Sequence, residues 1–291
     1  MDPAAPDRVV LRPMTGEDVP AIAALARAEG RNVGEADHRR FLALEGARGY
    51  VLVRDEALIG AATLMRYFEH GFLGPVILDP RADSAGFAIA LIAQLIESVQ
   101  REGVMVIEAE AAQVEEAILG RMGFSTLRRT LVLERPPSAA TAPAGSVTME
   151  DHHLLDVGSL DADAVGYGRK GYLAALMRDH PAGARVLVRD GEVSGYALVR
   201  RAPHGFQLGP LVTRDPDEAA AGVLLVDALS AAEGAAVVAL APEAAPHLAL
   251  LERHGFRRVG TLARMRGGTR AAPSETRVAA TEWVSGGRIT G

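Results

Sequence analysis

The 291-residue chain contains no cysteine. This absence excludes disulfides, thiolate nucleophiles and zinc-thiolate sites. No apolar run approaches the ~18–20 residues that a membrane-spanning helix needs, so we expect no membrane association. A basic excess is also lacking: 31 lysines and arginines face 37 aspartates and glutamates. The net charge of −6 argues against a general nucleic-acid binder.

We also expect no secretory signal. The opening residues, MDPAAPDRVV, show neither the basic nor the apolar region of such a signal, so we expect a cytoplasmic protein. The apolar fraction of 48% and the charged fraction of 23% are typical of a soluble globular protein. The chain length favours two domains over one.

The sequence repeats itself once on the scale of a domain. The pentapeptide VLVRD occurs at 51–55 and again at 186–190, an offset of 135. Further matches at nearly the same offset are LGP at 73–75 and 208–210, and RMGF at 121–124 with RHGF at 253–256. A nearly constant offset over more than seventy residues predicts a duplicated domain rather than a solenoid.

The boundary between the copies falls in RPPSAATAPAG (135–145), a segment rich in proline, alanine and glycine that is typical of a linker. We therefore expect an N-terminal domain over 1–135, a linker over 136–145 and a C-terminal domain over 146–291. The tail around Trp283 alternates apolar and polar residues and predicts an added C-terminal strand that pairs with a sheet edge.

Each copy shows the same expected order of elements, β-α-α-β-β-β-α-β-α-β. A helix is predicted after Thr15, with Asp18 completing a capping box. Tight hairpin turns are predicted at Asp55-Glu56 and at Asp190-Gly191. The order predicts an α/β domain with a mixed sheet.

This order, together with a small-residue turn after Pro80 and the pair Gly123-Phe124 after the fourth helix, resembles the GCN5-related N-acetyltransferase (GNAT) family. The second half, with YGRKGYLAAL, LGPLVTRDP and LLERHGF followed by RMRGG, is similar to the YitH/HolE-type acetyltransferase domain. The resemblance covers both halves. It implies two tandem GNAT-like domains, each a mixed, mostly antiparallel twisted sheet flanked by helices.

The resemblance also implies an acetyl-CoA site in the first half. The family's cofactor loop, Q/R-x-x-G-x-G/A, offers backbone N–H groups at a helix N-terminus to the pyrophosphate. Here aspartate replaces the leading cation, and Arg81 could reach a phosphate from two residues earlier. The implied cofactor-binding residues are Ile77, Leu78, Arg81, Asp83, Ser84, Ala85, Gly86, Phe87 and Ala88.

The second copy is predicted to be degenerate. Leu224 stands where the cofactor needs close approach to the backbone. Asp215, Asp217 and Glu218 place negative charge where a pyrophosphate would bind, and like charges repel.

Catalysis in the family uses a backbone N–H on the fourth strand, a base and often a tyrosine acid. The tyrosine position is Leu119 in the first half and Leu251 in the second. Each candidate base has an alternative role as a solvated charge at a strand end. Tyr67 is a candidate substitute for the missing acid, and its alternative role is ordinary packing. The candidate bases are Glu69, His70, Glu108 and Glu110.

The loop between the first two helices lies on the acceptor side in this family. We therefore expect Asn32 and Arg169, together with Tyr67, to contact the acceptor. The sequence GYGRKG (166–171) matches a dinucleotide fingerprint literally, but no buried strand precedes it, so a helix-loop-helix connection is favoured. No ligand set for a metal is complete, and we expect none.

The sequence therefore favours an acyl-CoA-dependent N-acyltransferase that acts on a primary amine of a small molecule or peptide. A catalytically inactive GNAT-fold protein that binds a ligand or acts as a scaffold is the alternative. We expect a monomer or a homodimer, because an internal duplication can replace the dimer that single-domain relatives form.

Overall fold

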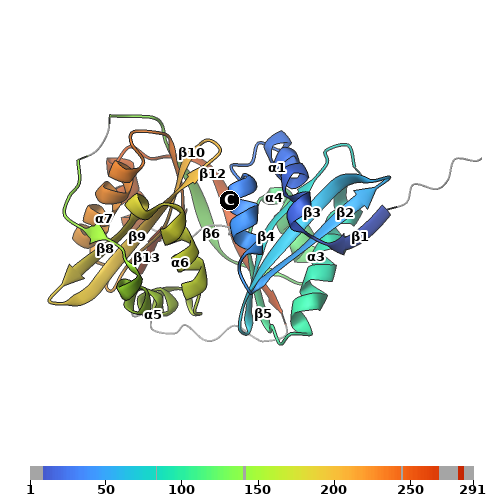
Figure 1. The fold of residues 1–291 in the computed structure, drawn as a ribbon, viewed down its shortest axis with the longest axis horizontal. Coiled ribbons are helices and arrows are strands. Elements are labelled where there is room, and N and C mark those ends of the chain that lie inside the picture. The colour runs from blue at the N-terminus through green and yellow to red at the C-terminus, as the bar shows by residue number, and fades with distance from the viewer. Residues whose placement is uncertain (1–8, 83, 140–141, 244, 269–280, 285–291) are drawn as a thin grey trace, which may run out of the picture.

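A computed structural model describes residues 9–82, 84–139, 142–243, 245–268 and 281–284. The element order predicted for each copy is confirmed (Figure 1). The first copy contains β1 (Val9–Pro13), α1 (Val19–Ala28), α2 (Glu35–Leu42), β2 (Ala47–Arg54), β3 (Ala57–Tyr67), β4 (His70–Leu78), α3 (Ser84–Gln100), β5 (Val106–Ala111), α4 (Gln113–Arg121) and β6 (Ser125–Arg135).

The second copy repeats this order and adds one strand. It contains β7 (Val147–Thr148), α5 (Leu154–Val165), α6 (Lys170–Asp179), β8 (Ala184–Arg189), β9 (Glu192–Ala202), β10 (Gly205–Thr213), α7 (Glu218–Ala231), β11 (Val237–Pro242), α8 (Ala245–Arg253), β12 (Arg257–Gly268) and β13 (Thr281–Val284). The fold is thus α/β in both halves, as the resemblance implied.

The predicted local signals form as expected. The Thr15 N–H donates to Asp18 Oδ2 at 2.8 Å, and the Thr15 hydroxyl donates to the same oxygen at 3.1 Å. At the first hairpin turn Asp55 and Glu56 both have positive φ, 46° and 68°, as a tight two-residue hairpin requires. These local contacts fix where the first helical turn begins and how β2 and β3 pair.

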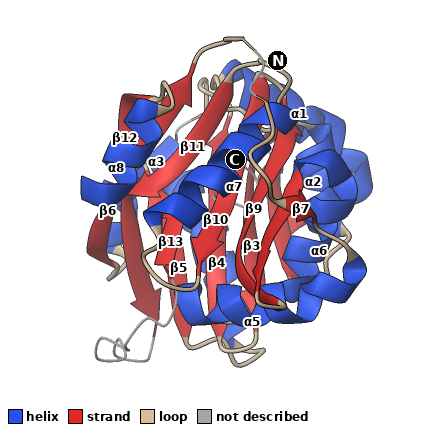
Figure 2. Ribbon diagram, turned by 90° about the vertical axis from the view of Figure 1, so that its left-hand side faces the viewer, coloured by secondary structure: helices blue, strands red, loops and turns tan. Residues whose placement is uncertain are grey.

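The two halves exchange their last long strands. The strand order is β1-β2-β3-β4-β5-β12-β6-β11-β10-β9-β8-β7, so β12 of the second copy pairs with β5, and β6 of the first copy pairs with β11. All of these pairs are antiparallel, and β6 also pairs with β12 at the centre (Figures 1 and 2). One continuous sheet therefore runs through both halves, with a pseudo-twofold relation between them.

The exchange separates chain order from spatial order. The boundary predicted at residue 135 assigns β6 to the N-terminal domain, whereas in space β6 lies between β12 and β11. Each half therefore completes its sheet with a strand that the other copy supplies.

The halves also share a hydrophobic core. Phe41, Met65 and Phe72 of the first copy pack in one buried cluster with Leu173 and Tyr196 of the second. Fully burying a side chain of this size contributes about 1.5–3 kcal/mol, so the junction stabilises both halves. Within the described part of the chain, no helix is long and apolar enough to span a membrane.

Candidate functional site

The first half contains an open cleft where two strands part. β4 and β5 pair in parallel only from His70–Leu73 with Val106–Ala109. Beyond these residues a cleft of about 790 Å³ opens between the end of β4, the start of α3 and α4. It is lined by Glu29, Arg31, Val76, Leu78, Asp79, Pro80, Ala85, Ala88, Ile92, Ala112, Gln113, Val114, Glu115, Ala117 and Ile118.

The predicted cofactor loop lies at the mouth of this cleft. Ser84 begins α3, Ala85 and Gly86 are exposed, and Ala88 is buried against the cleft. A Cβ built on Gly86 meets nothing within 4 Å, so the first turn of α3 is open to a ligand. Phe87 is half-buried beneath the guanidinium of Arg54, 5.3 Å from its ring centroid, and Asp83 lies outside the described residues.

The cation expected from Arg81 is already paired. Its Nε and Nη2 donate to Asp79 at 3.0 and 2.7 Å. The hydrogen bonds from Arg81 lower the pKa of Asp79 to about 2, so this carboxylate is charged at neutral pH. A phosphate at the α3 N-terminus would have to compete with Asp79 for Arg81.

Side chains from the end of α1 cover the backbone of β4 inside the cleft. The Leu78 N–H donates to Glu29 Oε1 at 2.7 Å, and Arg31 Nη2 donates to the Val76 carbonyl at 3.0 Å. Arg31 also reaches Glu115 on α4 at 3.2 Å. Local sequence patterns carried no signal for this Glu29–Arg31 pair, because its partners on β4 lie 45 and 49 residues away.

The candidate bases lie in different places. Glu69 immediately precedes β4 and His70 is the first residue of β4, whereas the predicted cofactor loop follows the last residue of this strand. The two ends of the nine-residue strand are about 26 Å apart at ~3.3 Å per residue. Glu110 and Gly74 line a separate, much smaller hollow of about 10 Å³, which shares Val76, Ile92 and Glu115 with the cleft. The family's tyrosine position, Leu119, is buried in the core beneath α4.

The two glutamates of β5 are buried and ion-paired with the exchanged strand β12. Arg264 bridges Glu108 and Glu110, and Arg266 donates to Glu108 at 2.8 Å. Burial alone would raise the pKa of Glu108, but Arg264 and Arg266 outweigh it and lower this pKa. The Thr130 hydroxyl donates to Glu110 Oε1 at 3.1 Å.

The predicted acceptor residues separate into two places. Tyr67 and Arg169 line one pocket between the halves. Arg169 is buried there and donates twice to Asp161, at 2.8 Å each. Asn32 lies elsewhere, where its Oδ1 accepts from the His204 N–H at 2.8 Å.

The corresponding cleft of the second half is filled. Asp217 caps α7 by accepting a hydrogen bond from the Ala220 N–H at 2.9 Å. This hydrogen bond and, to a lesser extent, the one from Arg189 lower the pKa of Asp217. Where β10 parts from β11, the C-terminal strand β13 pairs with Leu211–Thr213. The expected C-terminal strand thus lies inside the second cleft and contacts β11 as well.

Among the described residues, no cluster of histidine, aspartate and glutamate has the arrangement of a metal site. The features that remain are an open cleft at a helix N-terminus in the first half and a filled one in the second.

Comparison with known proteins agrees with this duplicated architecture. A family model described as an acetyltransferase (GNAT) domain matches residues 157–278. A putative acetyltransferase from Pyrococcus horikoshii has a TM-score of 0.78 at 20% identity, over 100% of this chain and 99% of that one. No curated protein matches the sequence.

Two further structures share the fold over most of both chains. A GCN5-related N-acetyltransferase from Sphaerobacter thermophilus has a TM-score of 0.64 at 17% identity, covering 93% of this chain and 98% of its own. A tandem GNAT protein from the clavulanic acid biosynthesis pathway has a TM-score of 0.65 at 16% identity, covering 91% and 100%. The chain is therefore a tandem protein of the GCN5-related N-acetyltransferase fold, and its second half matches the family model directly.

Proposed function

We propose that the first half is an acyl-CoA-dependent N-acyltransferase that transfers an acetyl group from acetyl-CoA to a primary amine of a small molecule or peptide. The observation that carries this proposal is the contrast between the two clefts. The first is open over about 790 Å³, whereas the second holds β13 and a capped helix.

The residues of the first cleft fit an acyl-CoA. The open first turn of α3 offers backbone N–H groups to a pyrophosphate, and the cleft-facing N–H of Leu78 and carbonyl of Val76 can bind an extended amide chain once Glu29 and Arg31 move aside. The bound thioester supplies the electrophilic carbonyl. In the transfer a C–N bond forms to the amine as the C–S bond breaks.

Of the candidate bases, Glu110 is the one that we assign to the transfer. It lines a small hollow beside the cleft, and Arg264 Nη1 lies 3.3 Å from its Oε1. A carboxylate there can take the proton that the attacking amine releases. Glu69 and His70 lie at the far end of β4, so we give them no role in this step.

The alternative, a non-catalytic ligand-binding protein, rests on separate observations. The Glu29–Arg31 pair occupies the β4 backbone, and Asp79 occupies Arg81. Both would also be present in an enzyme that rearranges when it binds its substrate. We also propose a cytoplasmic location and, because the halves already share one sheet and one core, a monomer or homodimer.

Calorimetric titration with acetyl-CoA tests the proposal. Val114 on α4 lines the first cleft with 73% of its surface exposed, so Val114→Trp fills the cleft without entering the core. The matched control is Val147→Trp on β7 at the far edge of the sheet, 50% exposed. We expect one site per chain that only Val114→Trp abolishes.

Either of two results would contradict the proposal. Binding that survives Val114→Trp would place the site elsewhere. Absence of binding at millimolar acetyl-CoA would favour the non-catalytic alternative. Where binding is seen, release of free thiol in the presence of a panel of primary amines measures transfer, and Glu110→Gln should slow that release without weakening acetyl-CoA binding.

A further inference from the structure

The two halves meet at two pseudo-equivalent junctions, and one of them is closed. There the tip of the β9–β10 hairpin packs against the loop between α1 and α2. The His204 N–H donates to Asn32 at 2.8 Å, and a Cβ built on Gly34 would lie only 3.1 Å from the Pro203 ring.

The other junction is hollow. Here the tip of the β3–β4 hairpin faces the loop between α5 and α6, and a pocket of about 380 Å³ remains between them. Residues of both halves line it, among them Glu45, Arg66, Tyr67, Phe68, Arg169 and Lys170. Because the equivalent junction is closed, the hollow is not a consequence of the duplicated fold alone. Its size is in the range of small-molecule sites, about 300–1,000 Å³.

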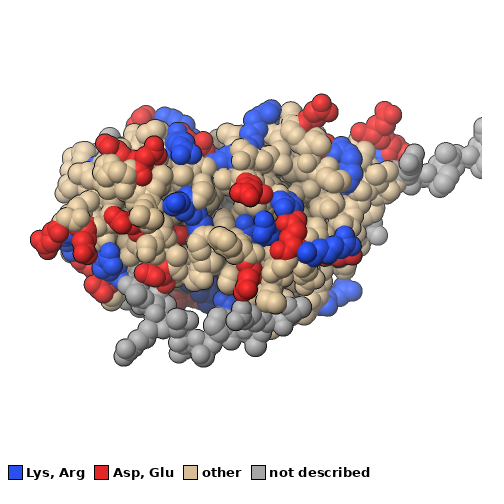
Figure 3. Space-filling view, turned by 60° about the horizontal axis from the view of Figure 1, so that its bottom comes forward, with Lys and Arg blue, Asp and Glu red and all other residues tan. Residues whose placement is uncertain are grey.

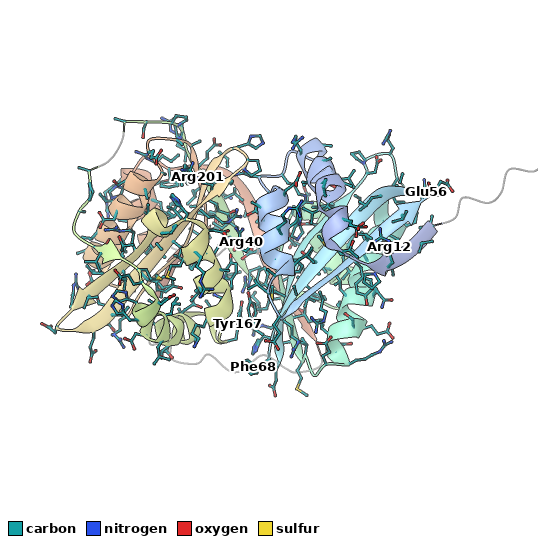
Figure 4. The ribbon with its side chains drawn as sticks, viewed as in Figure 1. Arg12, Arg40, Glu56, Phe68, Tyr167 and Arg201 are labelled. Atoms are coloured by element: carbon teal, nitrogen blue, oxygen red, sulfur yellow. The ribbon has the colours of Figure 1, made fainter. Side chains whose placement is uncertain are left out.

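Aromatic rings gather around this pocket. Tyr167 stacks on Tyr67 with centroids 5.3 Å apart and planes at 20°, and on His70 at 5.1 Å. Phe68 is 84% exposed although it has a left-handed φ of 53°, a conformation that bulky residues rarely adopt. Figure 4 labels Phe68 and Tyr167 at the lower end of the junction. Phe68 lies in the two-residue turn that joins β3 and β4, so the turn accounts for this φ, and its ring is left exposed beside the pocket.

The pocket carries an available positive charge. Arg169 is committed to Asp161, and Arg66 Nε lies 3.1 Å from Glu102. Lys170, in contrast, has no ion-pair partner within the part of the chain that the structure describes. It opens α6, whose first turn holds no acidic residue, and this helix end also favours an anion.

Space is left beside Lys170. A Cβ built on either Gly168 or Gly171 meets nothing within 4 Å. Glu45 lies in the other wall of the pocket, contributed by the first half, so an anionic group belongs at the α6 wall. On the face that Figure 3 shows, basic and acidic side chains are mixed, so no broad field of one sign accounts for binding there.

We propose that this interdomain pocket binds a small molecule with a planar aromatic ring and one anionic group. The ring lies against Phe68 and against Tyr67, on which Tyr167 stacks, and the anion lies at Lys170. The pocket is at the end of β3 and the start of β4, opposite the open cleft, so this is a second site whose occupancy does not depend on acyl-CoA binding.

Four probes of one ring size test the proposal by calorimetry on the intact chain: benzoate, phenyl phosphate, benzamide and benzylamine. We expect at least one anion to bind, benzamide to bind more weakly and benzylamine not to bind. The ratio of the Kd values of benzoate and phenyl phosphate shows which anion the site prefers. Lys170→Met should raise the Kd of the anion about tenfold and leave the Kd of benzamide unchanged. Tyr167→Ala should weaken every probe that binds.

The matched control is Arg201→Met, which removes one positive charge beside the closed junction and should change nothing. Acetyl-CoA added to the same titration should leave anion binding intact, so failure of this site and failure of the acyl-CoA cleft are measured separately. The proposal is overturned if neither anion binds at millimolar concentration. It is also overturned if Lys170→Met and Arg201→Met weaken binding of the anion equally.

Discussion

Replacing Glu29 by alanine should strengthen acetyl-CoA binding in the first cleft. In the structure Glu29 accepts the Leu78 N–H at 2.7 Å, one of the two β4 backbone groups that a ligand chain needs. A hydrogen bond to a charged group contributes about 1.5–3 kcal/mol, and binding must break this one. Its removal should therefore lower the Kd by about tenfold to a hundredfold, since 1.4 kcal/mol is a factor of ten.

Glu29 is a better residue to replace than Arg31, because its removal leaves no buried charged side chain without an ion-pair partner. Arg31 keeps its contact to Glu115 at 3.2 Å when Glu29 is removed. Calorimetric titration of acetyl-CoA into the variant measures the change, with Glu97→Ala as a control that removes one exposed carboxylate from α3. An unchanged or higher Kd for Glu29→Ala alone would refute the reasoning, because it would mean that Glu29 stays in place when the cleft is occupied.

Three further outcomes follow from the buried groups and from the tail. Burial lowers the pKa of His38 from 6.5 to about 4, so between pH 7 and pH 5 this histidine binds a proton in the unfolded chain but not in the folded one. The free energy of unfolding, measured by urea titration, should therefore fall by about 2 kcal/mol over this pH range. The His38→Leu variant should not show this loss. Arg264→Met removes the cation that pairs with two buried glutamates and should destabilise the protein by about 3 kcal/mol. Arg129→Met breaks only a surface pair and should cost clearly less in the same assay. Truncation after Gly268 removes β13, so hydrogen exchange should accelerate at Leu211–Thr213; unchanged protection there would contradict the pairing.

Periodicity and turn chemistry were enough to predict the elements of each half. The capping box at Thr15 and the turn at Asp55-Glu56 depend on residues that are close in sequence, and both form as predicted. The exchange of β6 and β12 could not be predicted in this way. Because the two strands are copies of one another, each satisfies the alternating pattern of either partner, and the pairing depends on the linker and on junction contacts such as Arg264 with Glu108.

The site was predicted in part. The sequence predicted a cofactor loop at the start of a helix. The structure places Ala85 and Ala88 of that segment in the lining of the open cleft, and cofactor binding there stays a prediction. It could not show that Glu29 and Arg31 cover β4, because residues 45 to 49 positions apart carry no periodic signal for one another. Nor could it separate Asn32 from Tyr67, since the loop that holds Asn32 meets the other half of the molecule.

The exchanged strands set the order in which a newly made chain can be finished. β5 ends at Ala111, but its partner strand ends at Gly268, so the N-terminal half stays one strand short while more than 150 further residues are synthesised. At ~5–20 residues per second that delay is on the order of ten seconds or more. During it the edge of β5 is an unpaired strand edge, the kind of surface that invites aggregation. Synthesis of β12, rather than of the first half, is the event that ends this exposure.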